Sequence, residues 1–301
     1  MSVRLLQKIR RNLVYYFVRG SLIFFNIIPR SIALFIGGWL GVVAWSVLPK
    51  DRYRIDRHLR LIYGERYSGS QRREIGRKFF ENSGRNLVDV MRLRRHFAKE
   101  ISPLITVEGL DHFDLAYRAG KGLIGITGHI GNFELLAVYL ASLGYDIAVI
   151  GREMYDSRIN RILVENREAM GLTNIGTTES PKRFLKWLHE GKVIGVLIDT
   201  DSMRVRSELV PFLGRLSNTP VGPIMLGMKS GAAFVPAVCV RTAGDGYSVI
   251  VKPQIQYETT GDFDADVANV TLLCNRVLGE IVDRYPDQWI WLHNRWHTAR
   301  G

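Results

Sequence analysis

The chain has 301 residues, 47% of them hydrophobic, and its 41 Lys and Arg against 29 Asp and Glu give a formal net charge of +12. This length can bury the core of one large α/β domain or of two small ones. The composition argues against a nucleic-acid partner, because no zinc-finger spacing or RNA-recognition signature accompanies the charge, and against a disulfide scaffold, because Cys239 and Cys274 stand in apolar surroundings that predict buried free thiols.

The N-terminal region carries much of the positive charge. Met1–Lys50 contains seven basic residues and no acidic one, and basic residues mixed with Leu, Tyr, Phe and Trp favour an anionic membrane surface as partner. The apolar run Asn12–Ile28 has Arg19 near its middle, which is costly inside hydrocarbon, so we expect an anchoring helix at the membrane surface. No small-residue cleavage site follows a compact apolar core, so we expect no signal peptide to be removed.

The next apolar run, Ser31–Leu48, allows two interpretations. It is uncharged and just long enough to span a bilayer, but its three glycines and the helical spacing of its large residues also suit a helix packed on the main domain. We expect a membrane-associating helical segment over Met1–Lys50 and an α/β domain over Asp51–Gly301.

The rest of the chain divides into a helical part and an alternating part. Asp51–Glu100 is basic, and its apolar residues recur at helical spacing, which predicts a core-facing stripe of Ile75, Phe79, Phe80, Leu87, Val90 and Met91, with the surrounding arginines solvated or against anionic lipid. After Ile101, strands are predicted at Ile105–Val107, Leu123–Ile126, Ile147–Ile150, Val193–Ile198, Phe234–Val240 and Tyr247–Val251, and helices at Asn132–Ser142, Asp156–Met170, Pro181–Glu190, Pro220–Lys229 and Asp264–Tyr285. This alternation predicts an α/β fold with a largely parallel central sheet and helices on both faces. The last two strands are expected to form an antiparallel hairpin.

The stretch from Lys121 to Leu140 carries the clearest chemical signal. Its strand leads into a loop with His129 between two glycines, and a helix follows with Glu134 in its first turn. Glycines permit unusual backbone conformations, and Asn132 is a favoured N-cap. We interpret this pattern as a His–carboxylate pair in which Glu134 fixes the imidazole tautomer and His129 removes a proton from a hydroxyl.

Three further residues are candidates for the same site. Ligands of parallel sheets gather at the carboxyl ends of the strands, where His129, Arg152 and Asp199 are all expected. Arg167, later in the helix after Arg152, forms either a surface salt bridge or an inward site for a phosphate.

We predict no metal and no cofactor. No histidine stands near Asp199 and Asp201 in the sequence, and an aspartate at a strand end often caps the adjoining loop. His293 and His297 have the spacing of a zinc pair but lack the glutamate of the metalloprotease motif. No phosphate-binding loop, dinucleotide fingerprint or nucleophile elbow is present.

The motif GHIGNFE, with the blocks REMYDSRINRILVENREAMG, LIDTDSMRVRSELVPFLGRLSNTPVGPIMLGMKSGAAFVPA and PDQWIWLHNRW, resembles the bacterial lipid A biosynthesis acyltransferases, the late lauroyl- and myristoyl-transferring enzymes of the glycerolipid acyltransferase superfamily. The resemblance covers nearly the whole chain. Phe133 stands where that family usually has Trp, and Thr200 where it tends to have Gln.

The resemblance implies transfer of an acyl chain from an acyl-carrier-protein thioester to a hydroxyl of a phosphorylated glycolipid, at the cytoplasmic face of the bacterial inner membrane. It implies that His129 is the general base and Glu134 its partner, and that Arg167 and Asp199 line the site near Arg152. Backbone amides of the glycine loop, at Gly131 and Asn132, or the guanidinium of Arg167 would then stabilise the oxyanion.

Two alternative functions are considered. The first changes the acceptor lipid, and the second is a different class of protein. The acceptor could instead be a phosphatidylinositol mannoside, an ornithine-type lipid or another glycolipid. A non-catalytic membrane-binding adaptor would also use the basic N-terminal block, but it would have no need of both His129 and Glu134 behind a strand end.

Overall fold

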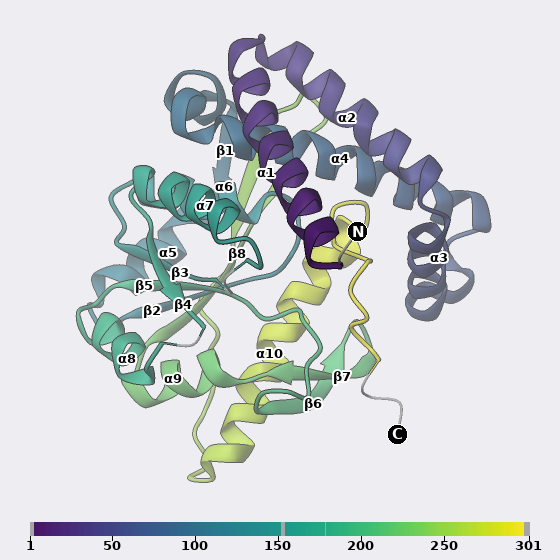
Figure 1. The fold of residues 1–301 in the computed structure, drawn as a ribbon. Coiled ribbons are helices and arrows are strands. Elements are labelled where there is room, and N and C mark those ends of the chain that lie inside the picture. The colour runs from purple at the N-terminus through teal and green to yellow at the C-terminus, as the bar shows by residue number, and fades with distance from the viewer. Residues whose placement is uncertain (1–2, 152–153, 178, 298–301) are drawn as a thin grey trace.

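The structure is a computed structural model that describes residues 3–151, 154–177 and 179–297. Its centre is a seven-stranded sheet in the order β1-β9-β8-β2-β5-β3-β4 (Figure 1). The strands are β1 (Ile105–Glu108), β2 (Leu123–Thr127), β3 (Ile147–Gly151), β4 (Thr173–Gly176), β5 (Val193–Leu197), β8 (Ala233–Arg241) and β9 (Tyr247–Val251). Only the β8–β9 pair is antiparallel among these described strands, which confirms the predicted α/β class and the predicted hairpin.

Helices cover both faces of this sheet. On one face lie α5 (Leu110–Arg118) and α6 (Phe133–Ser142), and on the other α8 (Pro181–His189), α9 (Gly222–Ser230) and α10 (Phe263–Arg284). Successive strand residues point to opposite faces, so Leu123 packs in the core under α5 and α6 while Ile124 packs in the core under α8 to α10. Both cysteines are buried and free, as predicted.

Three features were not predicted from the sequence: the helix α5, the strand β4 and a second hairpin. The strand β4 contains only one buried residue, Ile175, and so lacks the apolar run of a central strand. A separate antiparallel hairpin joins β6 (Ser207–Phe212) to β7 (Arg215–Pro220). Its two turn residues both have positive φ, +50° at Leu213 and +76° at Gly214. This geometry suits a two-residue hairpin, but leucine is not a sequence signal for it.

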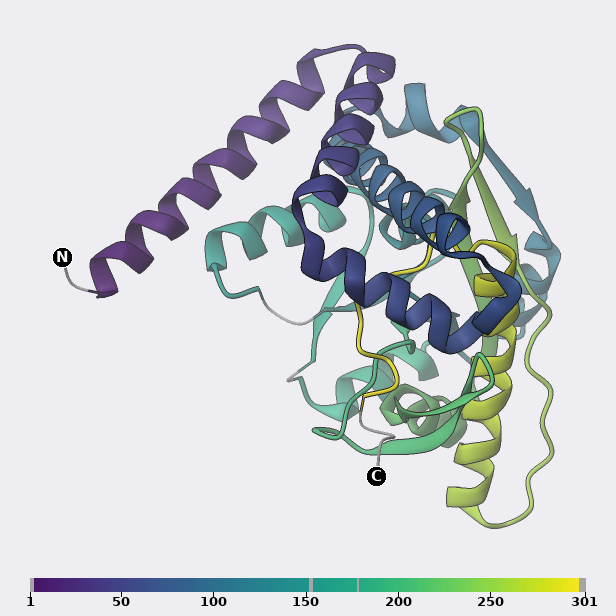
Figure 2. The same ribbon diagram turned by 90° about the vertical axis from the view of Figure 1, so that its right-hand side faces the viewer.

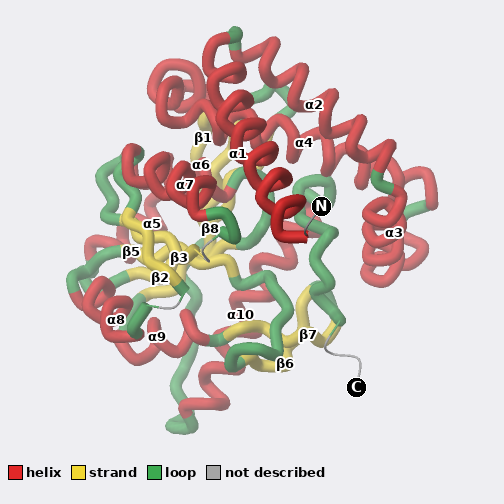
Figure 3. Tube along the Cα trace, viewed as in Figure 1, coloured by secondary structure: helices red, strands yellow, loops and turns green. Residues whose placement is uncertain are grey.

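Four helices precede the sheet: α1 (Val3–Ile27), α2 (Arg30–Val47), α3 (Pro49–Tyr63) and α4 (Gly69–His96). A short helical turn at Gly64–Arg66 lies between α3 and α4, and two more, Phe97–Ile101 and Ser102–Leu104, connect α4 to β1. A capping box formed by Ser68 and Gln71 starts α4. Figure 2 shows α1 projecting beside α7 (Ser157–Ala169), and Figure 3 shows α2 and α3 at the top and right, away from the strands.

The helix α4 departs from its predicted pattern at two positions. Leu87, expected in the core, is 56% exposed, because it faces a hollow described below. Arg92, expected to be solvated, is buried. Its guanidinium donates to the carbonyl oxygens of Phe25 and Ile28 and pairs with Glu100, and these contacts hold the end of α1 against α4.

Glycines bring the backbones of α2 and α4 together. A Cβ atom at Gly84 would lie 2.1 Å from the carbonyl oxygen of Gly37, and one at Gly41 would lie 2.1 Å from that of Phe80. Among the described helices, α2 alone is long and apolar enough to cross a membrane. One of its faces packs on α4, as one of the two interpretations of this segment expected.

Replacing Gly84 with alanine should therefore force α2 away from α4. We expect Gly84→Ala to lower the free energy of unfolding by about 1–3 kcal/mol, the usual cost of overpacking. Gly20→Ala is the matched control, since no atom lies within 4 Å of a Cβ built at Gly20, and alanine is the better helix former. Thermal unfolding in one detergent would measure both variants. A Gly84→Ala protein as stable as Gly20→Ala would contradict this packing.

Candidate active site

His129 and Asp199 extend two neighbouring strands by the same number of residues. In the parallel pairing of β2 with β5, Thr127 is level with Leu197, so His129 and Asp199 follow side by side at the carboxyl edge of the sheet. The imidazole Nδ1 lies 2.8 Å from Asp199 Oδ1, and the backbone N–H of His129 donates to Oδ2 at 2.7 Å. A Cβ at position 128 would lie 2.8 Å from Oδ2, which explains the glycine there.

The Asp199 carboxylate is enclosed by donors. Its side chain is 1% exposed, and Trp289 Nε1 donates a further hydrogen bond to Oδ2 at 2.8 Å. Burial by itself would raise the pKa of Asp199, but the hydrogen bonds from His129 and Trp289 hold that pKa below its usual value. The ionised carboxylate can only accept. In the neutral imidazole the proton therefore sits on Nδ1, and Nε2 keeps its lone pair.

The prediction that Glu134 orients His129 is wrong. Glu134, in the first turn of α6, is bound by Arg167 of α7, whose Nε lies 2.9 Å from Oε2 and whose Nη2 donates to Oε1. The first turn of α6 directs the Glu134 carboxylate toward α7, and the imidazole of His129 is hydrogen-bonded to Asp199 instead. Arg167 also donates to Asn174 Oδ1 at 3.2 Å. The Arg167 guanidinium points inward, as one of its two interpretations expected. It binds the Glu134 carboxylate, however, and is therefore not free to bind a phosphate.

Asn132 caps α6 as predicted, with its Oδ1 accepting from the amide of Leu135 at 3.1 Å. The amides predicted to bind substrate are occupied: that of Gly131 donates to the carbonyl of Gln288 at 2.9 Å, and that of Asn132 to the carbonyl of Cys239 at 2.7 Å. Close packing of this loop on β8 is the physical reason. Gly131 has φ +58°, and a Cβ there would lie 2.0 Å from the Cys239 oxygen. Arg152 lies outside the described residues.

A buried polar network supports the loop from behind. Asn132 Nδ2 donates to the hydroxyl of Tyr247 at 3.1 Å, and that hydroxyl donates to Asp89 Oδ2 at 2.8 Å. Arg241 and Arg30 bind the same carboxylate at 2.7 and 2.9 Å. The network links α2, α4, β8 and β9 to the start of α6. Sequence analysis missed it because its members are scattered along the chain.

The C-terminal segment completes the site. Besides Trp289, it supplies His293, whose ring centroid is 4.7 Å from that of His129 in an edge-to-face arrangement. Burial is the main reason that the pKa of His293 is lowered, and the neighbouring His129 adds to this effect. The only sequence signal for these residues was the PDQWIWLHNRW block. In the described ranges, no three His, Cys, Asp or Glu side chains group as a metal site would require.

Two hollows meet at this site. One has a volume of about 260 Å³ and lies between α4 and the histidine loop, where Asn86, Leu87 and Val90 face His129. The other is an apolar cleft of about 50 Å³ between the sheet and α6. Gly125 and Gly195, paired across β2 and β5, form part of its floor. Phe133 and Glu134 line both hollows, so a molecule reaching along the cleft would arrive beside His129.

Comparison with known proteins gives a consistent result. The sequence model of the family described as bacterial lipid A biosynthesis acyltransferase matches residues 4–298. The phosphatidylinositol mannoside acyltransferase of Mycobacterium tuberculosis is 27% identical over 72% of this chain and 68% of its own length. The lipid A biosynthesis lauroyltransferase and palmitoleoyltransferase of Escherichia coli are 25% and 22% identical, each over 90% of this chain and 87% of their own length.

The lowered pKa of Asp199 predicts a pH-dependent contribution to stability. A carboxylate whose folded pKa is depressed stabilises the protein above its ordinary value of about 3.9, and this contribution is lost as the pH falls through the folded pKa. We therefore expect Asp199→Asn to lower the free energy of unfolding at pH 5 and above, and this difference from the wild type to become smaller as the pH falls below about 4. Urea unfolding of the wild type and of Asp199→Asn between about pH 7 and pH 3 would measure the difference in their free energies of unfolding. A difference that does not change below pH 4 would contradict an ionised Asp199.

Proposed function

The chain belongs to the bacterial lipid A biosynthesis acyltransferase family and is a glycolipid acyltransferase, and we propose that it transfers a fatty acyl chain from an acyl-carrier-protein thioester to a hydroxyl of a lipid A precursor. The observation that carries the mechanism is the His129–Asp199 contact where the two hollows meet. A base with a fixed tautomer beside an apolar cleft is what acyl transfer to a hydroxyl requires.

In the proposed reaction, His129 Nε2 removes the proton of the acceptor hydroxyl as its oxygen attacks the thioester carbonyl. Asp199 holds the Nδ1–H tautomer and stabilises the imidazolium that forms. Collapse of the tetrahedral intermediate breaks the carbon–sulfur bond, and the imidazolium returns its proton to the leaving thiolate. The ester and the free thiol are the products. A thioester is already activated, so this route needs neither a metal nor a covalent intermediate on the enzyme.

The apolar cleft under α6 is proposed to hold the acyl chain. Its lining is mostly apolar, and the absence of side chains at Gly125 and Gly195 keeps its floor open. At about 50 Å³ the cleft is narrow, so the side chains along it must move when a long chain enters. The hydroxyl of Thr127, which is buried and has no hydrogen-bond partner in the described parts of the chain, lies in the same cleft. It is a candidate donor to the thioester oxygen.

The amides of the first turn of α6 are further candidates for the oxyanion. The first amides of a helix lack intrahelical partners and carry partial positive charge, and the Asn132 side chain occupies only that of Leu135. Glu134 and Arg167 act in this proposal as positioning residues, because their bidentate pair clamps α6 to α7 at the point where the cleft opens.

A phosphatidylinositol mannoside is the second candidate acceptor. The observation that favours it is the similarity to the mycobacterial enzyme of that name. The lipid A precursor is preferred because the two Escherichia coli relatives match over a larger part of both chains.

Membrane attachment is proposed at the cytoplasmic face of the bacterial inner membrane. Apolar side chains on α1 recur along one stripe and are exposed, among them Leu13, Phe17 and Phe24. The outer face of α2 adds Phe35 and Trp39, which are also exposed. Together with the basic residues of α1, these side chains suit insertion into an anionic lipid surface.

Substitutions can separate the roles of the two carboxylates. We expect His129→Ala to abolish acyl transfer, and Asp199→Asn to lower kcat by about 10²- to 10⁴-fold because the tautomer is no longer fixed. Glu134→Gln should reduce kcat less, since it weakens a clamp and leaves the base in place. Transfer to a lipid A precursor, followed by mass spectrometry, would measure all three variants. His189→Ala, at an exposed position on α8, is the control for folding. Transfer that survives in His129→Ala would contradict the mechanism.

The membrane proposal is tested on anionic vesicles. Deletion of 1–29 should release the protein, and Leu13→Ser/Phe17→Ser/Phe24→Ser should weaken retention by about tenfold or more through lost apolar burial. Leu115→Ser/Leu209→Ser provides the control, because these leucines are equally exposed but lie on α5 and β6. Cosedimentation gives the bound fraction. Full retention after the deletion would place the anchor elsewhere in the chain.

A further inference from the structure

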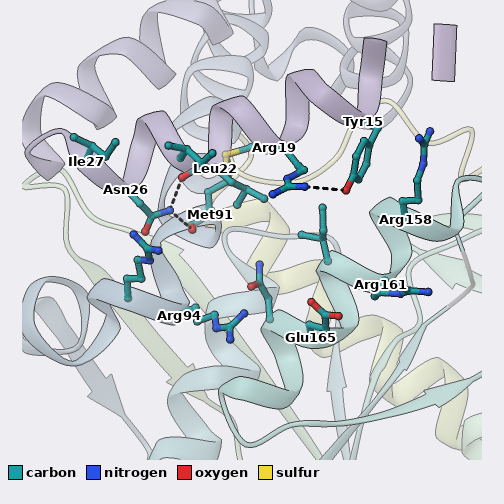
Figure 4. A pocket seen from close by; sticks show the side chains of 14 residues that line it. Tyr15, Arg19, Leu22, Asn26, Ile27, Met91, Arg94, Arg158, Arg161 and Glu165 are labelled. Atoms are coloured by element: carbon teal, nitrogen blue, oxygen red, sulfur yellow. Dashed lines mark hydrogen bonds between the residues drawn. The ribbon is translucent and has the colours of Figure 1, made fainter. Parts of the chain in front are cut away.

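A third hollow, which we call the arginine hollow, lies between α1, α4 and α7. Figure 4 shows it from close by, with side chains from all three helices around one space of about 510 Å³. Its charged lining consists of Arg19, Arg94, Arg95, Arg158, Arg161 and Glu165. Five arginines against one glutamate give these side chains a net charge of +4. The acyl-transfer mechanism uses none of them.

Most of these arginines have no acidic partner. Arg158 is paired with Asp156 at 2.8 Å, but the described part of the chain places no carboxylate within ion-pair distance of Arg94, Arg95 or Arg161, or of Arg19. Arg167, six residues after Arg161 on α7, is by contrast paired with Glu134. The free cationic groups therefore gather in this hollow rather than at His129, which makes the hollow the better site for an anion.

The hollow is held together by specific contacts. Asn26 Nδ2 donates to the carbonyl oxygens of Leu22 and Met91, at 2.7 and 2.9 Å, and so joins α1 to α4 (Figure 4). On the opposite side, Arg158 Nη1 donates to Asn12 Oδ1 at 2.9 Å, and its guanidinium stacks 4.4 Å from the ring of Tyr15. These contacts fix α1 over the hollow at two points.

The rim of the hollow is apolar. Ile23 and Ile27 line it and are 57% and 73% exposed. They continue the exposed apolar surface of α1, which is proposed to meet the membrane. A phosphate attached to acyl chains matches a cationic space beside such a surface, whereas the phosphate of a soluble donor would gain nothing from the isoleucines.

Two of these helices, α4 and α7, also border the acyl-transfer site. On α4, Val90 faces the hollow that contains His129, and the next residue, Met91, faces the arginine hollow. On α7, Arg167 binds Glu134, and its neighbour Asn166 lines the arginine hollow. A headgroup of sugar size could therefore keep an anionic group among the arginines while a hydroxyl reaches His129.

We propose that the arginine hollow between α1, α4 and α7 binds a phosphate group of the acceptor glycolipid and thereby positions the acceptor hydroxyl at His129. This inference rests on the proposed function, and it assigns the phosphate to residues other than Arg152 and Arg167.

Steady-state kinetics with a phosphorylated lipid A precursor and with the same lipid after phosphatase treatment tests the proposal. We expect Arg94→Gln/Arg95→Gln, and independently Arg161→Gln on α7, to raise KM for the phosphorylated acceptor by about tenfold or more, with kcat and the donor KM changed less than about twofold. With the dephosphorylated acceptor, variants and wild type should behave alike. Arg60→Gln/Arg73→Gln is the control, since both arginines are exposed and lie outside the hollow.

Three outcomes would overturn the proposal. The variants could raise the KM for the donor instead of the acceptor, they could raise the KM equally for the phosphorylated and the dephosphorylated acceptor, or the Arg60→Gln/Arg73→Gln control could show the same rise.

A binding measurement distinguishes failure of the phosphate site from failure of the proposed function, because it requires no turnover. His129→Ala protein should bind mixed micelles containing the phosphorylated lipid about tenfold more tightly than the same protein carrying Arg94→Gln/Arg95→Gln. Equal binding of the two proteins would refute the phosphate site even if acyl transfer is never observed.

Discussion

The rest of the site depends on one buried carboxylate. Asp199 is out of water, so its charge is tolerated only because His129 and Trp289 provide three hydrogen bonds. The two residues that donate lie in different parts of the chain, and each must be held in place. The glycine at position 128 lets the loop approach, the parallel register of β2 and β5 sets the two side chains level, and the C-terminal segment brings the indole.

A second buried carboxylate supports the first site from a distance. Asp89 forms ion pairs with Arg30 and Arg241 and accepts a hydrogen bond from Tyr247. The Tyr247 hydroxyl in turn accepts a hydrogen bond from Asn132 at the start of α6. Leaving one of these charges unpaired would be costly, so α2, α4 and the sheet must assemble together. The N-terminal helices are thus more than an attachment, because Arg30 of α2 takes part in the network that holds the histidine loop.

Sequence patterns located the elements of the site better than their partners. Apolar runs predicted most strands of the sheet, and the glycines around His129 with Asn132 predicted the loop and the helix start. The prediction that Glu134 is the partner of His129 was wrong, because it rested on their closeness in the sequence, five residues apart. The true partner of His129 is 70 residues away and is adjacent only because β5, not β3, lies next to β2. Strand order cannot be read from hydrophobic periodicity, and a leucine with positive φ likewise concealed the β6–β7 hairpin.

The central claim is that a His129–Asp199 pair transfers an acyl chain to a glycolipid, and the most direct measurement is mass spectrometry of membrane glycolipids. Lipids would be compared from cells that lack the gene, carry it intact, or carry it with His129→Ala. We expect one glycolipid to gain the mass of a single acyl chain only in cells that carry the intact gene. Identical glycolipids in all three would contradict this claim, as would the same gain with His129→Ala.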